Sequence, residues 1–187
     1  MGSNYTSNYF GLFFQDGDPQ GMNESVLQYP GMLGIIAPTL CQDGITRELQ
    51  IVQADSVMGT APREGALAFW ANEDQYLVTT NEAITGFGRG RCIGVFTCVV
   101  DIALAGSNYT AIVKKGRKTN VWFIDSPAAS PSGAGLFVVP HTTDGRADCI
   151  AAGSPATYPP IGRTSGTVLD AAEDLAECDV DVYGGVW

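Results

Sequence analysis

Charged residues are scarce in this sequence, and basic residues are scarcer than acidic ones. Charged residues make up 16% of the 187 positions, with 10 Lys plus Arg against 20 Asp plus Glu, so the formal net charge is −10. A protein that binds duplex nucleic acid needs a basic face to replace the counterions of the phosphates. The charge balance excludes that class, and we expect no nucleic-acid partner.

Long apolar runs are also missing. No window approaches the roughly 18 consecutive apolar residues of a membrane span. The N-terminal residues show no basic segment followed by an apolar one, which is the pattern of a secretory signal. We therefore expect no membrane partner, no export and synthesis in a cytoplasm.

Residue types that catalyse reactions or bind metal ions are few. His141 is the single histidine and stands in a predicted turn, and no Gly-x-Ser-x-Gly sequence marks a nucleophile. The five cysteines form no Cys-x-x-Cys pair, which favours buried apolar roles in a reducing compartment. Asp16 and Asp18 begin like a calcium loop, but Leu27 stands where such a loop needs a carboxylate. We expect no enzyme, no cofactor and no metal site.

The residues that are present indicate a mainly β fold. Short runs of apolar and β-branched residues are separated by Gly, Pro and Asn, which is typical of a sandwich or barrel. Residues 114–120 are predicted to be a hairpin loop between two strands. Residues 167–176 have the spacing of a short helix, although a strand that ends at Leu169 fits nearly as well. The expected strands cover residues 48–51, 65–70, 75–80, 93–100, 109–113, 121–124, 136–139 and 178–183.

A weak internal repeat runs through the chain. It is either a duplication or a chance recurrence of common words made of Gly and apolar residues. A duplication predicts two β units, 48–125 and 126–187, packed together because each alone buries little surface. In that case the two glycines that open the repeats begin equivalent strands. The matching words are Gly65 with Gly135, and Ile93-Gly94 with Ile161-Gly162.

Two groups of residues are candidates for contacts with a partner. The first is an extended N-terminal arm, residues 1–47, whose first 40 residues contain no Lys or Arg and sustain no strand or helix period. The arm lies either on another chain or over its own domain. The second group is basic, and it either meets acidic groups of a partner or forms solvated loops. The candidates are Tyr5, Tyr9, Phe10, Phe13, Phe14 and Tyr29 in the arm, and Arg89, Arg91, Lys114, Lys115, Arg117 and Lys118.

The order of several short sequence motifs resembles that of a known family. Gly-apolar openings at 65–68 and 135–140 precede a polar turn at 141–148, Ala-Ala-Gly at 151–153, Ile-Gly at 161–162, Leu-Asp-Ala-Ala at 169–172 and an alternating strand. This pattern resembles the capsid decoration proteins, or structural cement proteins, of tailed bacteriophages. The resemblance is best over residues 130–185 and looser over residues 48–125.

The resemblance implies both a fold and a function. Proteins of that family are small β-barrel or β-tulip proteins without catalytic residues, which bind the outside of the capsid lattice, often as trimers. For this chain it implies β-barrel or β-tulip units, a place on the capsid exterior of a virion, and two partners: the major capsid protein and copies of itself in a homotrimer. Two units and an aromatic arm distinguish this sequence from that family.

A second function remains open from the residues alone. A carbohydrate- or receptor-binding β-module of a virion or tail fibre has the same acidic, β-rich composition. In such a module Trp70, Trp122 and Trp187 would provide surfaces on which sugar rings stack. Exposed tryptophans in one cleft would favour this alternative, whereas buried ones favour the structural protein.

Overall fold

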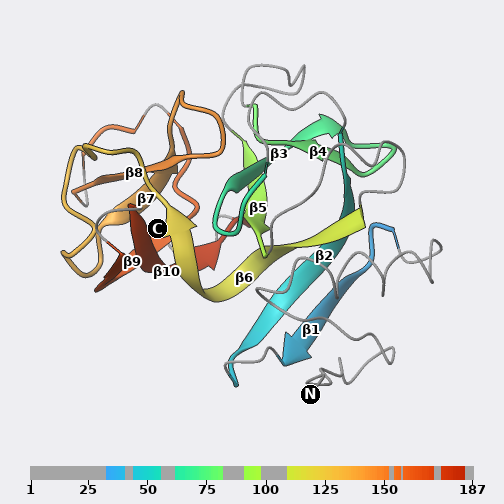
Figure 1. The fold of residues 1–187 in the computed structure, drawn as a ribbon, viewed down its shortest axis with the longest axis horizontal. Coiled ribbons are helices and arrows are strands. Elements are labelled where there is room, and N and C mark those ends of the chain that lie inside the picture. Colours follow the sequence, from blue (N-terminus) through green and yellow to red (C-terminus); the bar gives the residue numbers. More distant parts are fainter. Residues whose placement is uncertain are drawn as a thin grey trace.

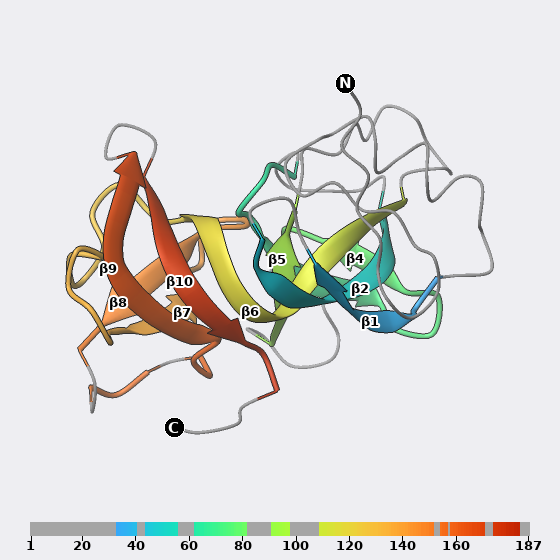
Figure 2. The same cartoon turned by 90° about the horizontal axis from the view of Figure 1, so that it is seen from below.

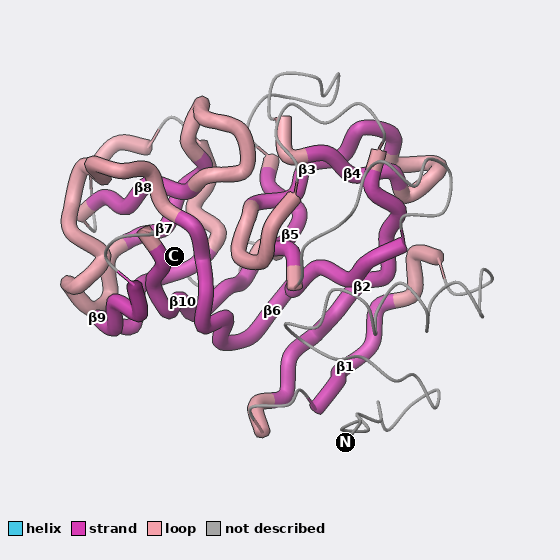
Figure 3. Tube along the Cα trace, viewed as in Figure 1, coloured by secondary structure: helices cyan, strands magenta, loops and turns pink. Residues whose placement is uncertain are grey.

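The described part of the chain is all β. The computed structural model describes residues 33–40, 44–55, 62–81, 91–97, 109–151, 154–156, 158–170 and 174–183. Within these ranges the chain consists of strands and loops, and the strands form one continuous hydrogen-bonded sheet (Figures 1 and 3). The strands are β1 (Ile36–Leu40), β2 (Thr46–Ala54), β3 (Leu67–Asn72), β4 (Leu77–Thr79), β5 (Cys92–Phe96), β6 (Tyr109–Trp122), β7 (Phe137–Pro140), β8 (Ala147–Ile150), β9 (Gly162–Asp170) and β10 (Leu175–Asp181).

Five of these strands close into a barrel. β2 pairs in parallel with β4, and antiparallel pairs then join β4 to β3, β3 to β5 and β5 to β6. The start of β6 returns to β2 as an antiparallel neighbour, which closes the circuit. We call this closed mixed barrel, made of β2 to β5 and the start of β6, the first barrel. The prediction of a mainly β fold with a small barrel is confirmed.

The second half of β6 belongs to another set of strands. Beyond Lys115 it pairs with β10, and the sheet continues through β9 and β7 to β8. An isolated parallel bridge between Ala147 of β8 and Phe123, the residue directly after β6, then connects β8 back to the end of β6. We call this set, made of the end of β6 and β7 to β10, the second unit. Figure 2 shows the curved β6, in yellow, running from one set into the other.

The continuous strand β6 corrects the predicted hairpin. Residues 114–120 were expected to be a loop, but they lie within β6. The strand changes neighbours near Lys115, where it leaves β2 and meets β10. Gly116 has a φ of 119°, a value that glycine adopts readily, and it allows the strand to bend at this crossing. Polar residues there contact acidic residues of β10, which the sequence spacing does not show.

Two further expectations change in the same way. The possible helix at 167–176 is wrong, because β9 and β10 occupy most of those residues as an antiparallel pair. The strand alternative is the correct one. At the other end of the chain, residues 36–40 of the predicted arm form β1, which pairs with β2. Residues 1–32 lie outside the described residues, so the arm itself stays a prediction.

The first barrel and the second unit have the same connectivity. In each, the first strand is parallel to the third, the third pairs with the second, the second with the fourth, the fourth with the fifth, and the fifth with the first. The strand β6 is the fifth strand of the first barrel and the first strand of the second unit. The division at residue 125 predicted from the sequence is therefore coarser than this arrangement, because one strand serves both units.

The glycines of the repeat occupy equivalent positions in the two units. Gly65 has a φ of 84° and stands two residues before β3, and Gly135 has a φ of 78° and stands two residues before β7. On the fourth strands, Gly94 pairs with Ala68, and Gly162 pairs with Val138. Each partner lies three residues beyond the opening glycine. The predicted equivalence of these glycines is confirmed at the level of strand register.

The hydrogen bonds around these glycines also match. The Gly65 N–H donates to the Phe96 carbonyl at 2.9 Å, and the Phe96 N–H donates back to the residue after the glycine at 2.8 Å. In the second unit the Gly135 N–H donates to the Thr164 carbonyl at 2.8 Å, and the Thr164 N–H donates back to the residue after Gly135 at 3.0 Å. The repeat in the sequence is thus a repeat of backbone contacts.

Close backbone approach explains the glycines on the fourth strands. A Cβ at Gly94 would lie 2.9 Å from the Val113 carbonyl oxygen on β6. A Cβ at Gly162 would overlap the carbonyl oxygen of Asp179, the corresponding residue of β10. Small units bend their strands sharply, so a glycine is required where the fourth strand crosses the fifth.

The two units differ in which strand faces are buried. All five residues of β5 are buried, whereas β10 alternates between buried and more exposed positions. One cluster of buried apolar side chains extends through both units, from Phe69 and Phe96 to Phe123. The strand β5 of the first barrel is therefore buried on both of its faces, whereas the second unit presents an outer sheet face to solvent.

No linker separates the units at their junction. The Leu67 N–H donates to the Gly145 carbonyl at 2.7 Å, and the Gly145 N–H donates to the Thr80 carbonyl at 2.8 Å. The Trp122 N–H donates to the Gly65 carbonyl at 3.0 Å. These bonds, together with the shared strand β6, join the two units through their backbones.

Candidate partner-binding surface

A row of side chains crosses the exposed face of the second unit. Arg117 on β6 stands opposite Asp179 on β10, which stands opposite Arg163 on β9. Arg163 in turn stands opposite Phe137 on β7. Directly opposite residues on a sheet are close enough to interact, so the register brings these four side chains into one row. We call Arg117, Asp179, Arg163 and Phe137 the cross-strand row.

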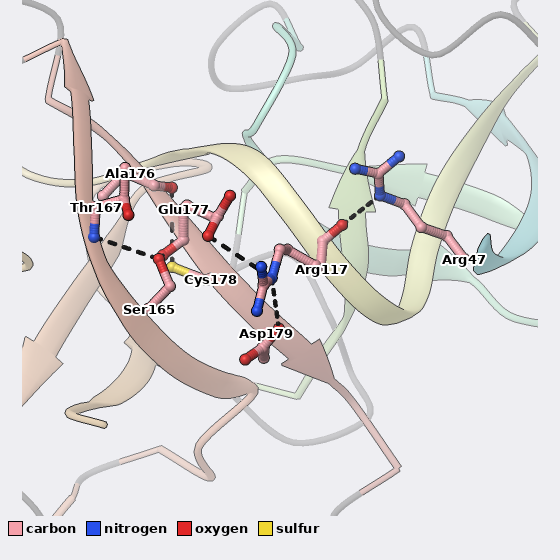
Figure 4. Close-up of polar contacts among 8 residues, drawn as sticks. All are labelled: Arg47, Arg117, Ser165, Thr167, Ala176, Glu177, Cys178 and Asp179. Atoms are coloured by element: carbon pink, nitrogen blue, oxygen red, sulfur yellow. Dashed lines mark hydrogen bonds and ion pairs between the residues drawn. The ribbon is translucent and has the colours of Figure 1, made fainter. Parts of the chain in front are cut away.

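Ion pairs join the row to its neighbours. The Arg117 Nε lies 3.3 Å from Asp179 Oδ1 and 3.6 Å from Glu177 Oε1, as Figure 4 shows. Next to it, the Lys115 Nζ lies 3.3 Å from Asp181 Oδ2. Solvent screens pairs of this kind, so each contributes only about 0–1 kcal/mol to stability. These ion pairs matter more because they fix a pattern of positive and negative charges on the exposed face of the sheet.

Arg163 differs from the other basic residues of this face. Its guanidinium carbon lies 4.7 Å from the centre of the Phe137 ring, which is a cation–π contact. Within the described residues Arg163 has no ion-pair partner. It is exposed on the face of the sheet. The Arg163 guanidinium can therefore bind a carboxylate of another molecule without breaking an ion pair of this chain, whereas Arg117 would have to break one.

Backbone contacts hold the basic part of β6 in place. The side chain of Arg47, which is only 1% exposed, donates from Nε to the Arg117 carbonyl (Figure 4). On the other side of the face, the Ser165 hydroxyl donates to the Glu177 carbonyl at 3.1 Å and accepts the Thr167 N–H at 3.3 Å. The strands that carry the row are thus fixed by contacts on both flanks.

The predicted basic residues have different surroundings. Lys115 and Arg117 are exposed, and their acidic neighbours lie on β10 of the same chain. Lys114 is only 7% exposed, and burial lowers the pKa of its amine. Its Nζ lies 5.6 Å from the centre of the Tyr183 ring. Lys114 is therefore a poor candidate for a first contact with a partner. Contacts of Lys115 and Arg117 with a second chain stay a prediction.

The other candidates are mostly outside the described residues. Arg91 is exposed and directly precedes β5. Lys118 lies in β6, but its side chain belongs to the undescribed part, as do Arg89 and the six aromatic residues of the arm. Sequence reasoning missed Phe137 and Arg163. The alternation in β10 indicated outward acids, but no local pattern shows that β9 and β7 lie beside them.

A second charged cluster lies at the junction of the two units. The guanidinium groups of Arg63 and Arg146 lie over the Trp122 ring, at 4.8 Å and 4.2 Å from its centre. Arg146 also forms ion pairs with Asp125 and, at 3.8 Å, with Asp174. Arg146 lowers the pKa of the Asp125 carboxyl, whereas burial and then the neighbouring Asp125 raise the pKa of the Asp174 carboxyl.

The tryptophans do not gather in one cleft within the described residues. Trp70 on β3 and Trp122 on β6 are both half-buried, and Trp187 is not among the described residues. The Trp70 ring contacts Tyr76 edge to face, with ring centres 6.2 Å apart. The Trp122 ring is occupied by two arginines. By the criterion set from the sequence, this arrangement does not favour a sugar-binding cleft.

Among the described residues, the single histidine lies in a turn and three cysteines lie in the core. The His141 Nδ1 accepts the Thr143 N–H at 3.0 Å, so the predicted turn role of this histidine is confirmed. Cys92, Cys149 and Cys178 are buried and free. Burial raises the pKa of Cys92 to about 12 and that of Cys149 to about 11. In the described ranges, no three His, Cys, Asp or Glu side chains gather where they could hold a metal ion. No helix there is long and apolar enough to cross a membrane.

Comparison with protein-family models finds no matching model, and comparison with curated proteins finds no matching sequence. The functional argument therefore depends on the residues, the fold and the charged face of the second unit.

Proposed function

We propose that this chain is a non-enzymatic decoration, or cement, protein of a tailed-phage capsid. In this proposal it is made in the host cytoplasm and binds the outer surface of the head lattice. Its partners are the major capsid protein and copies of itself, as a homotrimer. It stabilises the head by bridging neighbouring capsid subunits. The sequence words between residues 130 and 185 supply the family resemblance on which the proposal depends.

The structural observation that carries the proposal is the fusion of two like-connected units through β6. A bridge between capsid subunits must transmit force without stretching. The shared strand and the hydrogen bonds of Leu67, Gly145 and Trp122 join the units without a flexible linker. A rigid body that binds only the assembled lattice stabilises that lattice by mass action. A β protein with this build is suited to that task.

The cross-strand row supports the same proposal. A face with fixed charges of both signs selects its partner and its orientation more than it adds affinity. In Arg163 the row offers one guanidinium without a carboxylate partner among the described residues. We propose that this face meets an acidic patch of the capsid surface or of a sister chain. The six aromatic residues of the arm would add apolar anchors, since aromatic side chains dominate the energetics of many interfaces.

Reconstitution with phage heads tests the proposal. Heads purified without this protein are mixed with the purified full chain, and binding is measured by co-sedimentation at several salt concentrations. We expect saturable binding and a higher temperature of DNA release. Arg163→Glu should weaken binding most strongly at low salt, whereas Arg163→Lys, which keeps the positive charge at the same position, is the matched control. Heads that bind no protein at any salt concentration would contradict the proposal.

One observation keeps the alternative function in view. Near the turn between β3 and β4, the Trp70 and Tyr76 rings contact each other edge to face, and the Asn72 amide donates to the Gln75 side chain at 3.2 Å. Aromatic rings beside side-chain amides suit the binding of sugars, because the rings stack and the amides form hydrogen bonds. A glycan array probed with the full chain tests this function. Specific binding that Trp70→Ala removes would favour a carbohydrate-binding module over a cement protein.

A further inference from the structure

An apolar cavity opens at one end of the second unit, beside the ends of β9 and β10. Its volume is about 180 Å³. Phe123, Ile124, Val168 and Leu175 line its apolar walls. An apolar cavity of roughly 150 Å³ is large enough to hold a benzene ring. The cavity therefore has room for one aromatic ring or one branched aliphatic side chain. Val168 at its edge is 38% exposed, so the cavity is accessible from solvent.

The loop that forms one wall is fixed before any ligand binds. Its residues include Pro127 and Pro131, each with a restricted φ. The Ala128 N–H donates to Asp148 Oδ1 at 2.8 Å, and the Ala129 N–H donates to the Cys149 carbonyl at 2.8 Å. A wall held by its own backbone contacts pays little conformational entropy on binding. The cavity is preformed rather than a gap that closes around a ligand.

The rim of the cavity carries excess negative charge. The Asp174 carboxyl lines the cavity, and Asp125 lies beside it with a side chain that is 81% exposed. Arg146 pairs with both carboxyls, and among the described residues no other cation does. Asp174 has a φ of 57°, which is unusual for a residue other than glycine. Its carbonyl accepts the Phe123 N–H at 2.8 Å, which holds this conformation at the rim.

We propose that this cavity is an anchor site for a partner protein and that it takes one aromatic or branched apolar side chain that stands next to a lysine or arginine. The apolar walls take the side chain, and the carboxyl groups of the rim take the neighbouring cation. A second copy of this chain is disfavoured as the occupant, because each copy has a net charge of −10 and its first 40 residues contain no Lys or Arg. The proposal does not depend on the function in phage heads.

Three small peptides test the site on the full chain. The probes are N-acetyl-Phe-Lys-amide, N-acetyl-Phe-Glu-amide and N-acetyl-Ser-Lys-amide, which separate the ring from the charge. Binding is followed by backbone amide shifts in NMR spectra of the ¹⁵N-labelled protein. We expect saturable shifts at Ile124, Val168 and Leu175 with a Kd of about 1 mM for the Phe-Lys probe. We expect binding at least about threefold weaker for Phe-Glu, because of its charge, and for Ser-Lys, because it lacks the ring.

Variants at the cavity complete the test. Val168→Trp fills the cavity and should remove the shifts, and Val168→Lys places a cation at the rim and should weaken the Phe-Lys probe by a similar factor. The double change of Asp125→Asn and Asp174→Asn should make the Phe-Lys and Phe-Glu probes bind alike. Equal binding of all three probes to the wild type, or no saturable shift, would overturn the proposal. Self-association of the wild type that Val168→Trp abolishes would also overturn it, because the occupant would then be a second copy.

Discussion

Replacement of Gly65 and of Gly135 by alanine measures how much the close packing at the junction of the two units contributes to stability. Both glycines have left-handed φ values and open equivalent strands. Their surroundings differ, however. A Cβ at Gly65 would overlap the carbonyl oxygen of Asn120 on β6, whereas a Cβ at Gly135 would meet nothing within 4 Å. Gly135→Ala is therefore a matched control for Gly65→Ala.

The expected costs follow from these contacts. Gly135→Ala should lower the free energy of unfolding by about 1–2 kcal/mol, because an alanine is placed in the left-handed region. Gly65→Ala should lower it by the same amount and by a further ~1–3 kcal/mol, because the new Cβ is overpacked against backbone that cannot move aside. It also endangers the hydrogen bond from the Trp122 N–H to the Gly65 carbonyl, which contributes about 1 kcal/mol. The excess for Gly65→Ala is then about 2–4 kcal/mol.

Urea and thermal unfolding of the two variants measure this difference. For a chain of this length, 1 kcal/mol corresponds to about 2–4 °C in Tm, so the Gly65→Ala variant should melt roughly 4–16 °C below the Gly135→Ala variant. If the Gly65→Ala protein is insoluble and the Gly135→Ala protein is soluble, that outcome agrees in direction with the expected loss of stability. Equal Tm values for the two variants would refute the reasoning, because the junction would then contribute nothing to the stability of the chain.

Three further predictions follow from other sites. Gly162→Ala should lower the free energy of unfolding by about 1–3 kcal/mol, because its Cβ would overlap a carbonyl of β10; a change below 0.5 kcal/mol, on the order of an ordinary surface substitution, would contradict this. With pKa values of about 12 for Cys92 and about 11 for Cys149, both thiols should resist iodoacetamide at pH 8 until the protein is denatured, as peptide mapping by mass spectrometry would show. At pH 7, Asp174→Asn should raise Tm and Asp125→Asn should lower it, because the folded state raises the first pKa and lowers the second. The effect of Asp174→Asn should fade as the pH falls from the raised pKa of Asp174 to the usual aspartate pKa of about 3.9, whereas the effect of Asp125→Asn should fade only below about 3.9; effects at pH 3 equal to those at pH 7 would refute the assignment.

The glycine-containing motifs of the internal repeat were the most informative part of the sequence. Gly65 and Gly135 mark the starts of equivalent strands because a left-handed residue is needed there, and Gly94 and Gly162 mark close backbone crossings. Both requirements are local, so they leave a trace in the sequence. The all-β class was predictable for the same reason, since strand and turn patterns are local too.

The path of β6 could not be predicted from local patterns. The basic residues from Lys114 to Lys118 read as a solvated loop because acidic partners are not adjacent in the sequence. Their neighbours Glu177, Asp179 and Asp181 lie about 60 residues away, and only strand pairing brings them together. A polar run on the exposed face of a paired strand has the same composition as a loop.

The candidate surface was predictable only in part. The acidic positions of β10 follow from its alternation, and Lys115 and Arg117 were named as contact residues. Arg163 and Phe137 were missed, because their role depends on the order β10, β9, β7 in the sheet. Long-range strand order is set by the packing of the whole unit, and no short window of sequence records it.

Cryo-electron microscopy of phage heads incubated with the purified chain shows directly whether the protein bridges capsid subunits. We expect a two-lobed density on the outer surface of the head, with each copy contacting two neighbouring capsid subunits and with the exposed face of β6, β10, β9 and β7 at a protein contact. Heads that remain bare at saturating protein, or density that touches a single subunit through another face, would contradict it.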